Sequence, residues 1–305
     1  MLSESWTLAQ PRDLRSLVDL SVVIERAGAH GVLVGEHVVM GPDAGRNGVP
    51  ANPRDFFRNG NQRPADAHPS SLELLSAMAA VTTHLVLHAV ALLSPLRHPL
   101  VLGKQLATLD LISQGRLVFM PSTSWQQEEY AALAVDFDKR GEILDEQLEV
   151  WRGAWRDDVL SHRGTHYEFR DVYFEPKPWR PDGPLLWIGG SRLHRRAIRR
   201  AVRYADGVFP GKVPTDEELD LLSWALAQEG RRLEDTDLCM WLGAETPFPD
   251  DRGPKPLGPA LDAAAPHFSR GIATFVMKAS QYIDHVDQLG DLVAEAQTGL
   301  RERLR

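Results

Sequence analysis

Residues 85–120, LVLHAVALLSPLRHPLVLGKQLATLDLISQGRLVFM, contain the pattern that decides the fold. Two short apolar runs rich in Val and Leu, residues 85–92 and 116–120, flank a stretch of helical period at residues 99–112. A strand, a crossover helix and a second strand in this order build a parallel sheet. The stretch therefore predicts an α/β fold.

The same alternation extends over the whole chain. Five further strands are expected, at residues 31–35, 185–188, 207–209, 238–243 and 273–277. Six further helical stretches are expected around them, at residues 12–27, 71–81, 138–156, 193–204, 216–229 and 284–304. Because (β/α)8 barrels use about 250 residues or more for a single domain, residues 1–305 are predicted to form one TIM-type barrel domain.

The first strand of this barrel is weak. A (β/α)8 barrel needs eight strands, and the missing one should precede the first helix, where only residues 5–9 are available. Either these residues form an abbreviated first strand, or the barrel is partly open on that side.

Composition and charge narrow the class of protein. The formal net charge of −8 and the pI near 5.8 oppose binding to nucleic acid or to anionic lipid. The single cysteine, Cys239, and a start without a basic and then apolar pattern favour the cytoplasm. The longest apolar run, residues 85–93, is interrupted by His88 and is far below the roughly 20 residues of a membrane span.

Two stretches interrupt the alternation of strands and helices. Residues 40–70 are dense in Gly, Pro, Asn and Asp, and residues 157–184 contain a Pro-rich run. Long loops within a compact domain are usually lids or binding loops, so both are expected at the mouth of the barrel. A disordered excursion is the alternative for residues 40–70, against which Phe56 and Phe57 argue.

Polar residues follow four of the expected strands. Active sites of such barrels lie at the C-terminal ends of the strands, so these loops should converge on one ligand. They contain Glu36 and His37, residues 94–98, residues 121–125, and residues 189–192.

An ordered series of short motifs accompanies these loops. It comprises VGEH at residues 34–37, LRHP at 96–99, LDLISQGRL at 109–117, VDFDKRG at 135–141 followed by Asp145 and Glu146, PKP at 176–178, WIGG at 187–190 and ADG at 205–207. Over residues 27–211 this order resembles the luciferase-like oxidoreductases, particularly the actinobacterial branch that uses the deazaflavin coenzyme F420. The resemblance implies a flavin or deazaflavin at the C-terminal mouth.

His37 is the strongest catalytic candidate. An imidazole at the mouth can donate or accept a proton near neutral pH, and the resemblance implies a histidine against the tricyclic cofactor. The alternative is that His37 only caps the strand end. Glu36 is a candidate for cofactor binding, but it is more readily interpreted as orienting His37 or pairing with Arg97.

The loop at residues 121–125 departs from the Gly-rich turn that is common in the family. Hydroxyls of Thr123 and Ser124 are expected to hydrogen-bond the cofactor. Trp125 is either a wall of the substrate pocket or the anchor of the next helix, and His98 is a second candidate for the pocket.

Gly189, Gly190 and Ser191 lead from a strand into a helix, where backbone N–H groups and the helix dipole favour a phosphate. Arg192, and with it Arg195, is expected to meet that phosphate or an acidic tail of the cofactor. The arginines further along this helix are expected on a solvated face; they are Arg199, Arg200 and Arg203.

Other charged groups are given structural roles. The pairs His84 with His88 and His162 with His166 lack a converging carboxylate set or a cysteine, so no metal site is predicted. Helix-surface or inter-loop salt bridges are the predicted role of Glu128 and Glu129, with Arg140, and of the pair Asp145 and Glu146.

The leading hypothesis is an oxidoreductase that transfers a hydride between coenzyme F420 and a small organic substrate, with His37 managing the proton. The first alternative is an FMN-dependent monooxygenase, because the same barrel serves both chemistries. The second is a non-catalytic flavin-binding protein or supporting subunit. Apolar residues in excess on the helix at residues 144–155 predict a homodimer. The sequence carries no code for the identity of the substrate.

Overall fold

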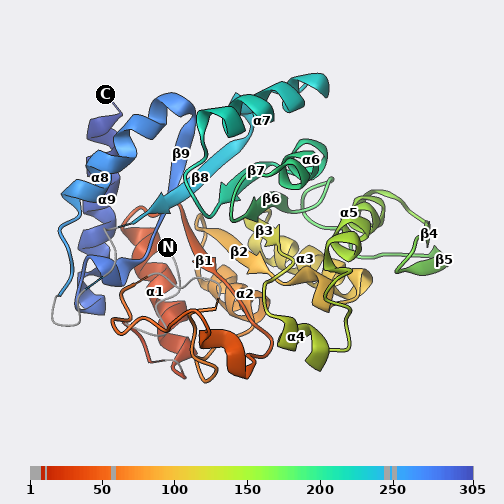
Figure 1. Cartoon of the computed structure of the whole chain (residues 1–305), viewed down its shortest axis with the longest axis horizontal. Helices are drawn as coiled ribbons and strands as arrows, with labels where there is room; N and C mark the ends of the chain where they lie inside the picture. Colours follow the sequence, from red (N-terminus) through yellow and green to blue (C-terminus); the bar gives the residue numbers. More distant parts are fainter. Residues whose placement is uncertain (1–7, 11, 56–59, 244–247, 249–252, 305) are drawn as a thin grey trace.

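The computed structural model describes residues 8–304 except 11, 56–59, 244–247 and 249–252. Seven parallel strands curl into a nearly closed barrel in the order β1-β2-β3-β6-β7-β8-β9 (Figure 1). They are β1 (Gly31–Val34), β2 (Val86–Leu92), β3 (Leu117–Pro121), β6 (Leu185–Gly190), β7 (Gly207–Pro210), β8 (Asp237–Leu242) and β9 (Ile272–Met277). All seven expected strands are confirmed. Of residues 5–9, Leu8 and Ala9 form a turn and a bend, and the rest lie outside the described residues.

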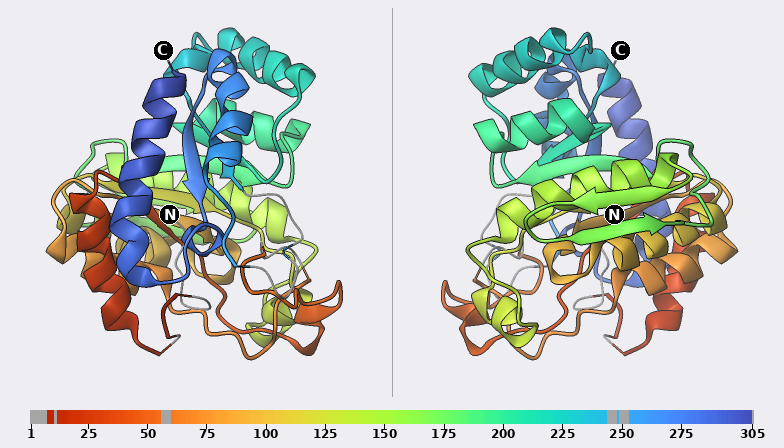
Figure 2. Two further views of the ribbon diagram at one scale, coloured as in Figure 1. Left: turned by 90° about the vertical axis from the view of Figure 1, so that its left-hand side faces the viewer. Right: turned by 90° about the vertical axis from the view of Figure 1, so that its right-hand side faces the viewer.

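The helices surround the sheet. The seven predicted ones are α1 (Leu14–Arg26), α2 (Ser71–Val81), α3 (Pro99–Ser113), α5 (Arg140–Arg156), α6 (Arg195–Tyr204), α7 (Asp216–Gln228) and α9 (Leu289–Arg303). Although α1 and α9 are far apart in the sequence, they lie side by side (Figure 2). Two short helices were not predicted, because six or seven residues carry too little helical period: α4 (Gln127–Ala132) and α8 (Gly258–Ala264).

The expected loop at residues 157–184 contains an antiparallel hairpin instead. Its strands are β4 (Leu160–Arg163) and β5 (Glu168–Val172), and it lies beside α5 on the outside of the barrel (Figure 2). Glu146 of α5 accepts hydrogen bonds from the backbone N–H groups of residues 165–167 at the tip of the hairpin. The prediction that this segment covers the mouth is therefore wrong for the hairpin.

The loop at residues 40–70 docks onto the C-terminal end of β9, as its predicted place at the mouth requires. The Nζ atom of Lys278, a fully buried side chain just after β9, donates to the carbonyls of Pro53 and Asp55. Arg54 donates in return to the carbonyls of Ser280 and Ile283. Phe56 and Phe57 lie outside the described residues.

Two apolar layers hold the barrel together. The interior is filled by Leu33, Val90, Val118, Met120, Trp187, Phe209, Cys239 and Val276, and a larger cluster lies between the sheet and the helices. Leu144, Leu148, Trp151 and Trp155 of α5 belong to that cluster and are each at most 5% exposed. The apolar excess that predicted a homodimer is thus buried within one chain, and that premise is wrong.

Within the described ranges, no helix has the length and apolar character that crossing a membrane requires.

Candidate active site

His37 lies directly beyond the end of β1 and is held by a carboxylate from another loop. Its Nδ1 atom is 3.1 Å from Oε2 of Glu129, a fully buried residue of α4. Because an ionised carboxylate only accepts hydrogen bonds, this contact favours the neutral tautomer with the proton on Nδ1 and with Nε2 as the acceptor. Only 9% of the His37 side chain is exposed, so this orientation is enclosed by protein.

Glu129 also fixes the backbone around His37. Its Oε1 atom accepts a hydrogen bond of 2.6 Å from the N–H of Val38 and one of 3.4 Å from that of Val39. The hydroxyl of Ser124 lies 3.5 Å from Oε2. Glu129 therefore joins the loop after β1 to the loop after β3.

Two further rings pack edge-on against His37. The ring centroid of His68, from the loop at residues 40–70, is 5.0 Å away, and that of Trp125 is 5.9 Å away. Burial, with a smaller contribution from nearby His37, lowers the pKa of His68 to about 4. At neutral pH, His68 is an uncharged neighbour.

The contacts of Glu36 link neighbouring elements of the barrel. Its carboxylate accepts hydrogen bonds of 2.7 and 3.0 Å from the two terminal nitrogens of Arg97, which form a bidentate pair. It also accepts the N–H of Leu93 and the hydroxyl of Ser71. The pairing with Arg97 that the residue types favoured is present, and it ties β1 to the loop after β2 and to α2.

The loop after β3 is built around hydroxyls. Ser124 adopts a left-handed backbone with φ of 53°, and its N–H donates to the hydroxyl of Ser122. The carbonyl of Thr123 accepts a hydrogen bond from the phenol of Tyr130. This bond involves the backbone of Thr123 and not its side-chain hydroxyl. The carboxamide of Gln126 is buried and has no hydrogen-bond partner among the described residues.

The two glycines that end β6 differ in their surroundings. A Cβ atom on Gly189 would lie 2.2 Å from Sδ of Met120, so packing requires glycine there. At exposed Gly190 the nearest atoms to a Cβ would be 3.6 Å away, so the protein leaves that position open. A ligand can approach the backbone at Gly190.

The first turn of α6 begins later than expected. The helix starts at Arg195, and the side chain of His194 accepts the N–H of Ala197 as its cap. Ser191 and Arg192 form an exposed turn between Gly190 and this helix, and Nε of Arg192 is 3.0 Å from Oε1 of Glu218 in α7. An anion at this turn would compete with Glu218 for Arg192.

Residues 2–243 match the family model described as luciferase-like monooxygenase. The chain belongs to the luciferase-like monooxygenase family. The resemblance inferred from the ordered motifs is confirmed. The family consists of oxidoreductases and monooxygenases, with flavin-dependent and F420-dependent members.

Curated relatives match about half of this chain. An uncharacterized protein of Mycobacterium tuberculosis is 33% identical over 164 residues, which are 53% of this chain and 55% of the relative. The FMNH2-dependent dimethylsulfone monooxygenase of Pseudomonas putida is 31% identical over 148 residues, which are 48% of this chain and 40% of the relative. The chain thus spans about half the length of the curated relatives it matches.

Solved structures share the fold at low identity. The monooxygenase RslO1 of Streptomyces bottropensis has a TM-score of 0.71 at 18% identity, covering 97% of this chain and 96% of its own. The long-chain alkane monooxygenase LadA has a TM-score of 0.69 at 16% identity, covering 96% and 88%. The coenzyme F420 dependent tetrahydromethanopterin reductase of Methanopyrus kandleri has a TM-score of 0.57 at 15% identity, covering 79% and 63%. At these identities the likeness concerns the barrel alone.

Among the expected site residues of this luciferase-like protein, His37, Ser124 and Trp125 are brought together around Glu129. Exposed His98 instead caps α3, where its Nδ1 accepts the N–H of Leu100, and packs edge-on against Tyr167. The structure therefore gives His98 a helix cap and a ring contact, but no contact with His37.

Two assignments of charged residues are wrong. Glu129 was expected to form a helix-surface or inter-loop salt bridge with Arg140, but its partner is His37 and its side chain is fully buried. Arg200 was expected on a solvated face, but its side chain is 13% exposed and pairs with Asp145 at 2.6 Å. Both residues are on helices whose neighbours the sequence does not reveal.

Proposed function

We propose that this protein is a deazaflavin-dependent oxidoreductase that transfers a hydride between coenzyme F420 and a small organic substrate. The observation that carries the proposal is the enclosed His37, whose Nδ1 faces buried Glu129 at the mouth of the barrel. When bound, the deazaflavin supplies the hydride chemistry. The protein supplies position and a proton.

His37 would exchange that proton at Nε2. With Nδ1 bonded to Glu129, the neutral ring can accept a proton at Nε2, and the adjacent carboxylate stabilises the imidazolium that results. His68 is largely neutral above about pH 4, so it adds no positive charge beside His37 at neutral pH. The pair thus forms a proton carrier of fixed orientation.

Groups in the loops after β3 and β6 fit a cofactor that has a tricyclic ring and a phosphate. Open Gly190 allows close approach of backbone to a ligand, and Arg192 offers a guanidinium in the next turn. The hydroxyl of Thr123 and the carboxamide of Gln126, which has no hydrogen-bond partner in the described part of the chain, offer hydrogen bonds from the loop after β3. We assign cofactor binding to these groups and to Ser124, Gly189 and Ser191, and give Glu36 the supporting role of fixing its loop.

The order of motifs supports the deazaflavin. The second candidate, an FMN-dependent monooxygenase, is favoured by the relative named as an FMNH2-dependent enzyme, which is 31% identical over 148 residues. The fold does not discriminate between the two candidates, because a monooxygenase and a coenzyme F420 dependent reductase both share it.

The test is a pair of equilibrium titrations of the ligand-free protein, one with coenzyme F420 and one with FMN in both redox states. We expect saturable binding of F420, seen as a change in cofactor fluorescence, and weaker binding of FMN. Tight binding of reduced FMN alone would replace the proposal by the monooxygenase. Binding of neither would favour a supporting subunit without a cofactor of its own.

A further inference from the structure

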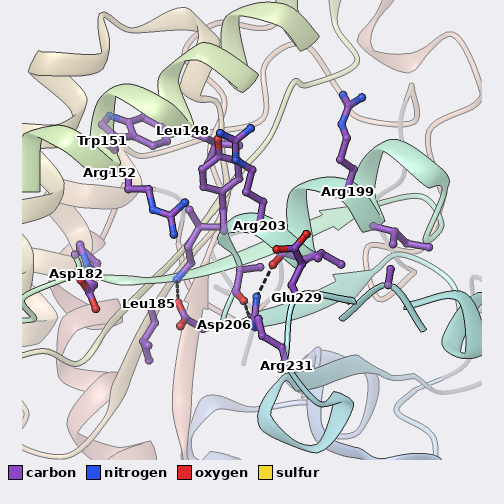
Figure 3. A pocket seen from close by; sticks show the side chains of 18 of the residues that line it. Leu148, Trp151, Arg152, Asp182, Leu185, Arg199, Arg203, Asp206, Glu229 and Arg231 are labelled. Atoms are coloured by element: carbon purple, nitrogen blue, oxygen red, sulfur yellow. Dashed lines mark hydrogen bonds between the residues drawn. The ribbon is translucent and has the colours of Figure 1, made fainter. Parts of the chain in front are cut away.

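A large groove opens on the outside of the barrel, far from His37. It has a volume of about 1450 Å³ and lies between α5, α6 and α7 (Figure 3). Leu185 and Leu186, the first residues of β6, and Asp206, just before β7, line its base. Because all strands of the barrel run parallel, these N-terminal strand ends lie at the end opposite to the mouth, where His37 follows β1.

The groove concentrates positive charge on an acidic protein. Three carboxylates line it, those of Asp182, Asp206 and Glu229. Asp182 is paired with Arg156, and Asp206 accepts a hydrogen bond from the backbone N–H of Leu186. Seven arginines line it: Arg152, Arg156, Arg180, Arg195, Arg199, Arg203 and Arg231.

Four of these arginines have no ion pair with a carboxylate of the described residues. Two of the four, Arg180 and Arg231, donate to backbone carbonyls instead, and the other two are Arg152 and Arg195. Arg152 and Arg203 both face the ring of Tyr204, with guanidinium carbons 5.7 and 5.2 Å from its centroid. Arg203 is also 3.6 Å from Glu149, whereas neither Arg152 nor Arg195 has an ion pair with any residue that the structure describes. Like charges gathered at one ring repel each other, so an anion between them would be stabilised.

The other side of the groove is apolar. Trp224 and Leu221 of α7 are 61% and 37% exposed, and Ile198 and Val202 of α6 continue the surface. An exposed indole beside free guanidinium groups can pack on an apolar body while the arginines bind an acidic head.

We propose that this groove is a second ligand site, which binds a small amphipathic anion: an aromatic or aliphatic body that carries a carboxylate, sulfonate or phosphate. Its place at the other end of the barrel makes it independent of the cofactor and substrate at the mouth. With a net charge of −8, the whole protein repels anions, so the binding rests on these arginines and not on a general attraction.

The test uses 1-anilinonaphthalene-8-sulfonate as a fluorescent probe and decanoate as a competitor. We expect saturable enhancement of the probe's fluorescence and its displacement by decanoate, but not by decyltrimethylammonium. The double variant Arg152→Gln/Arg195→Gln should lower probe affinity at least tenfold, because each lost charge-assisted contact costs about that factor. Trp224→Ala should weaken binding as well.

Matched variants distinguish the groove from other surfaces. Arg15→Gln/Arg26→Gln removes two exposed arginines of α1, and Trp125→Ala alters the mouth; both should bind the probe as the wild type does. Unchanged affinity of the Arg152/Arg195 variant would overturn the proposal. So would an equal loss in Trp125→Ala, or displacement by the cation as effective as that by decanoate.

Discussion

At the scale of single residues, the pair of His37 and Glu129 is the centre of the proposed site. The place of His37 after an apolar strand, the proton chemistry of imidazole and the family resemblance together singled it out from the sequence. Glu129 was not singled out, because its burial depends on α4, a helix of six residues, folding under the loop after β1. A carboxylate beside a second one in a polar stretch has the sequence signature of a surface pair, and only tertiary structure distinguishes the two cases.

Replacing His37 by Ala should remove the proton carrier without removing the groups assigned to the phosphate. We expect turnover to fall by roughly 10²-fold or more, within the range for general acid–base residues, with a modest loss of cofactor affinity. Steady-state kinetics together with a cofactor titration of the same variant measures both. Full turnover with the true substrate would make His37 a structural cap.

Replacing Glu129 by Gln should act through His37. The amide keeps the size of the side chain but removes the charge that favours the protonated imidazole, so turnover should fall about tenfold. The pH at which turnover is half of its maximum should also move to lower values. Glu128→Gln, at the neighbouring position, is the matched control and should keep the wild-type profile. A profile that is identical in all three proteins would limit Glu129 to holding the loop.

At the scale of elements, local pattern located the strands and the long helices but not what the loops do. The strands bury Val, Leu and Phe on both faces, so their continuous apolar runs are visible in the sequence. The hairpin of β4 and β5 is half exposed and has strands of four and five residues. Its partner, α5, could only be identified in three dimensions, through Glu146.

In the turn between β6 and α6, Arg192 is expected to affect cofactor binding but not the chemical step. Arg192→Ala should weaken the cofactor by roughly 1 to 3 kcal/mol through a lost charge-assisted hydrogen bond, while turnover at saturating cofactor stays nearly unchanged. Isothermal titration of the cofactor measures the loss. Arg196→Ala is the control, since that exposed side chain has no ion pair in the described part of the chain. Equal affinities of the two variants would remove Arg192 from the site.

At the scale of the whole molecule, buried His88 and half-buried His68 make stability depend on pH. Burial lowers the pKa of His68 to about 4 and that of His88, inside the barrel against Trp187, to about 3. The unfolded chain binds protons near pH 6.5 at these residues while the folded chain does not. Stability is therefore full above about pH 6.5 and falls as the pH decreases toward 4 and 3, by about 2 kcal/mol per histidine at pH 5.

Urea unfolding at pH 7 and pH 5 checks this dependence. His88→Leu should reduce the loss of unfolding free energy between the two pH values by about 2 kcal/mol. His84→Leu, at an exposed position four residues before, should leave it unchanged. The same loss in His88→Leu as in the wild type would show that His88 does not titrate as its burial requires.

At this scale we propose one barrel domain over residues 1–305 with a cofactor at its mouth. A crystal structure of the protein with bound coenzyme F420 tests this most directly. We predict the deazaflavin ring in contact with His37 and Trp125, and the phosphate beside Gly190 and Arg192. A ring bound away from His37, for instance in the groove between α5 and α7, would contradict the proposed site.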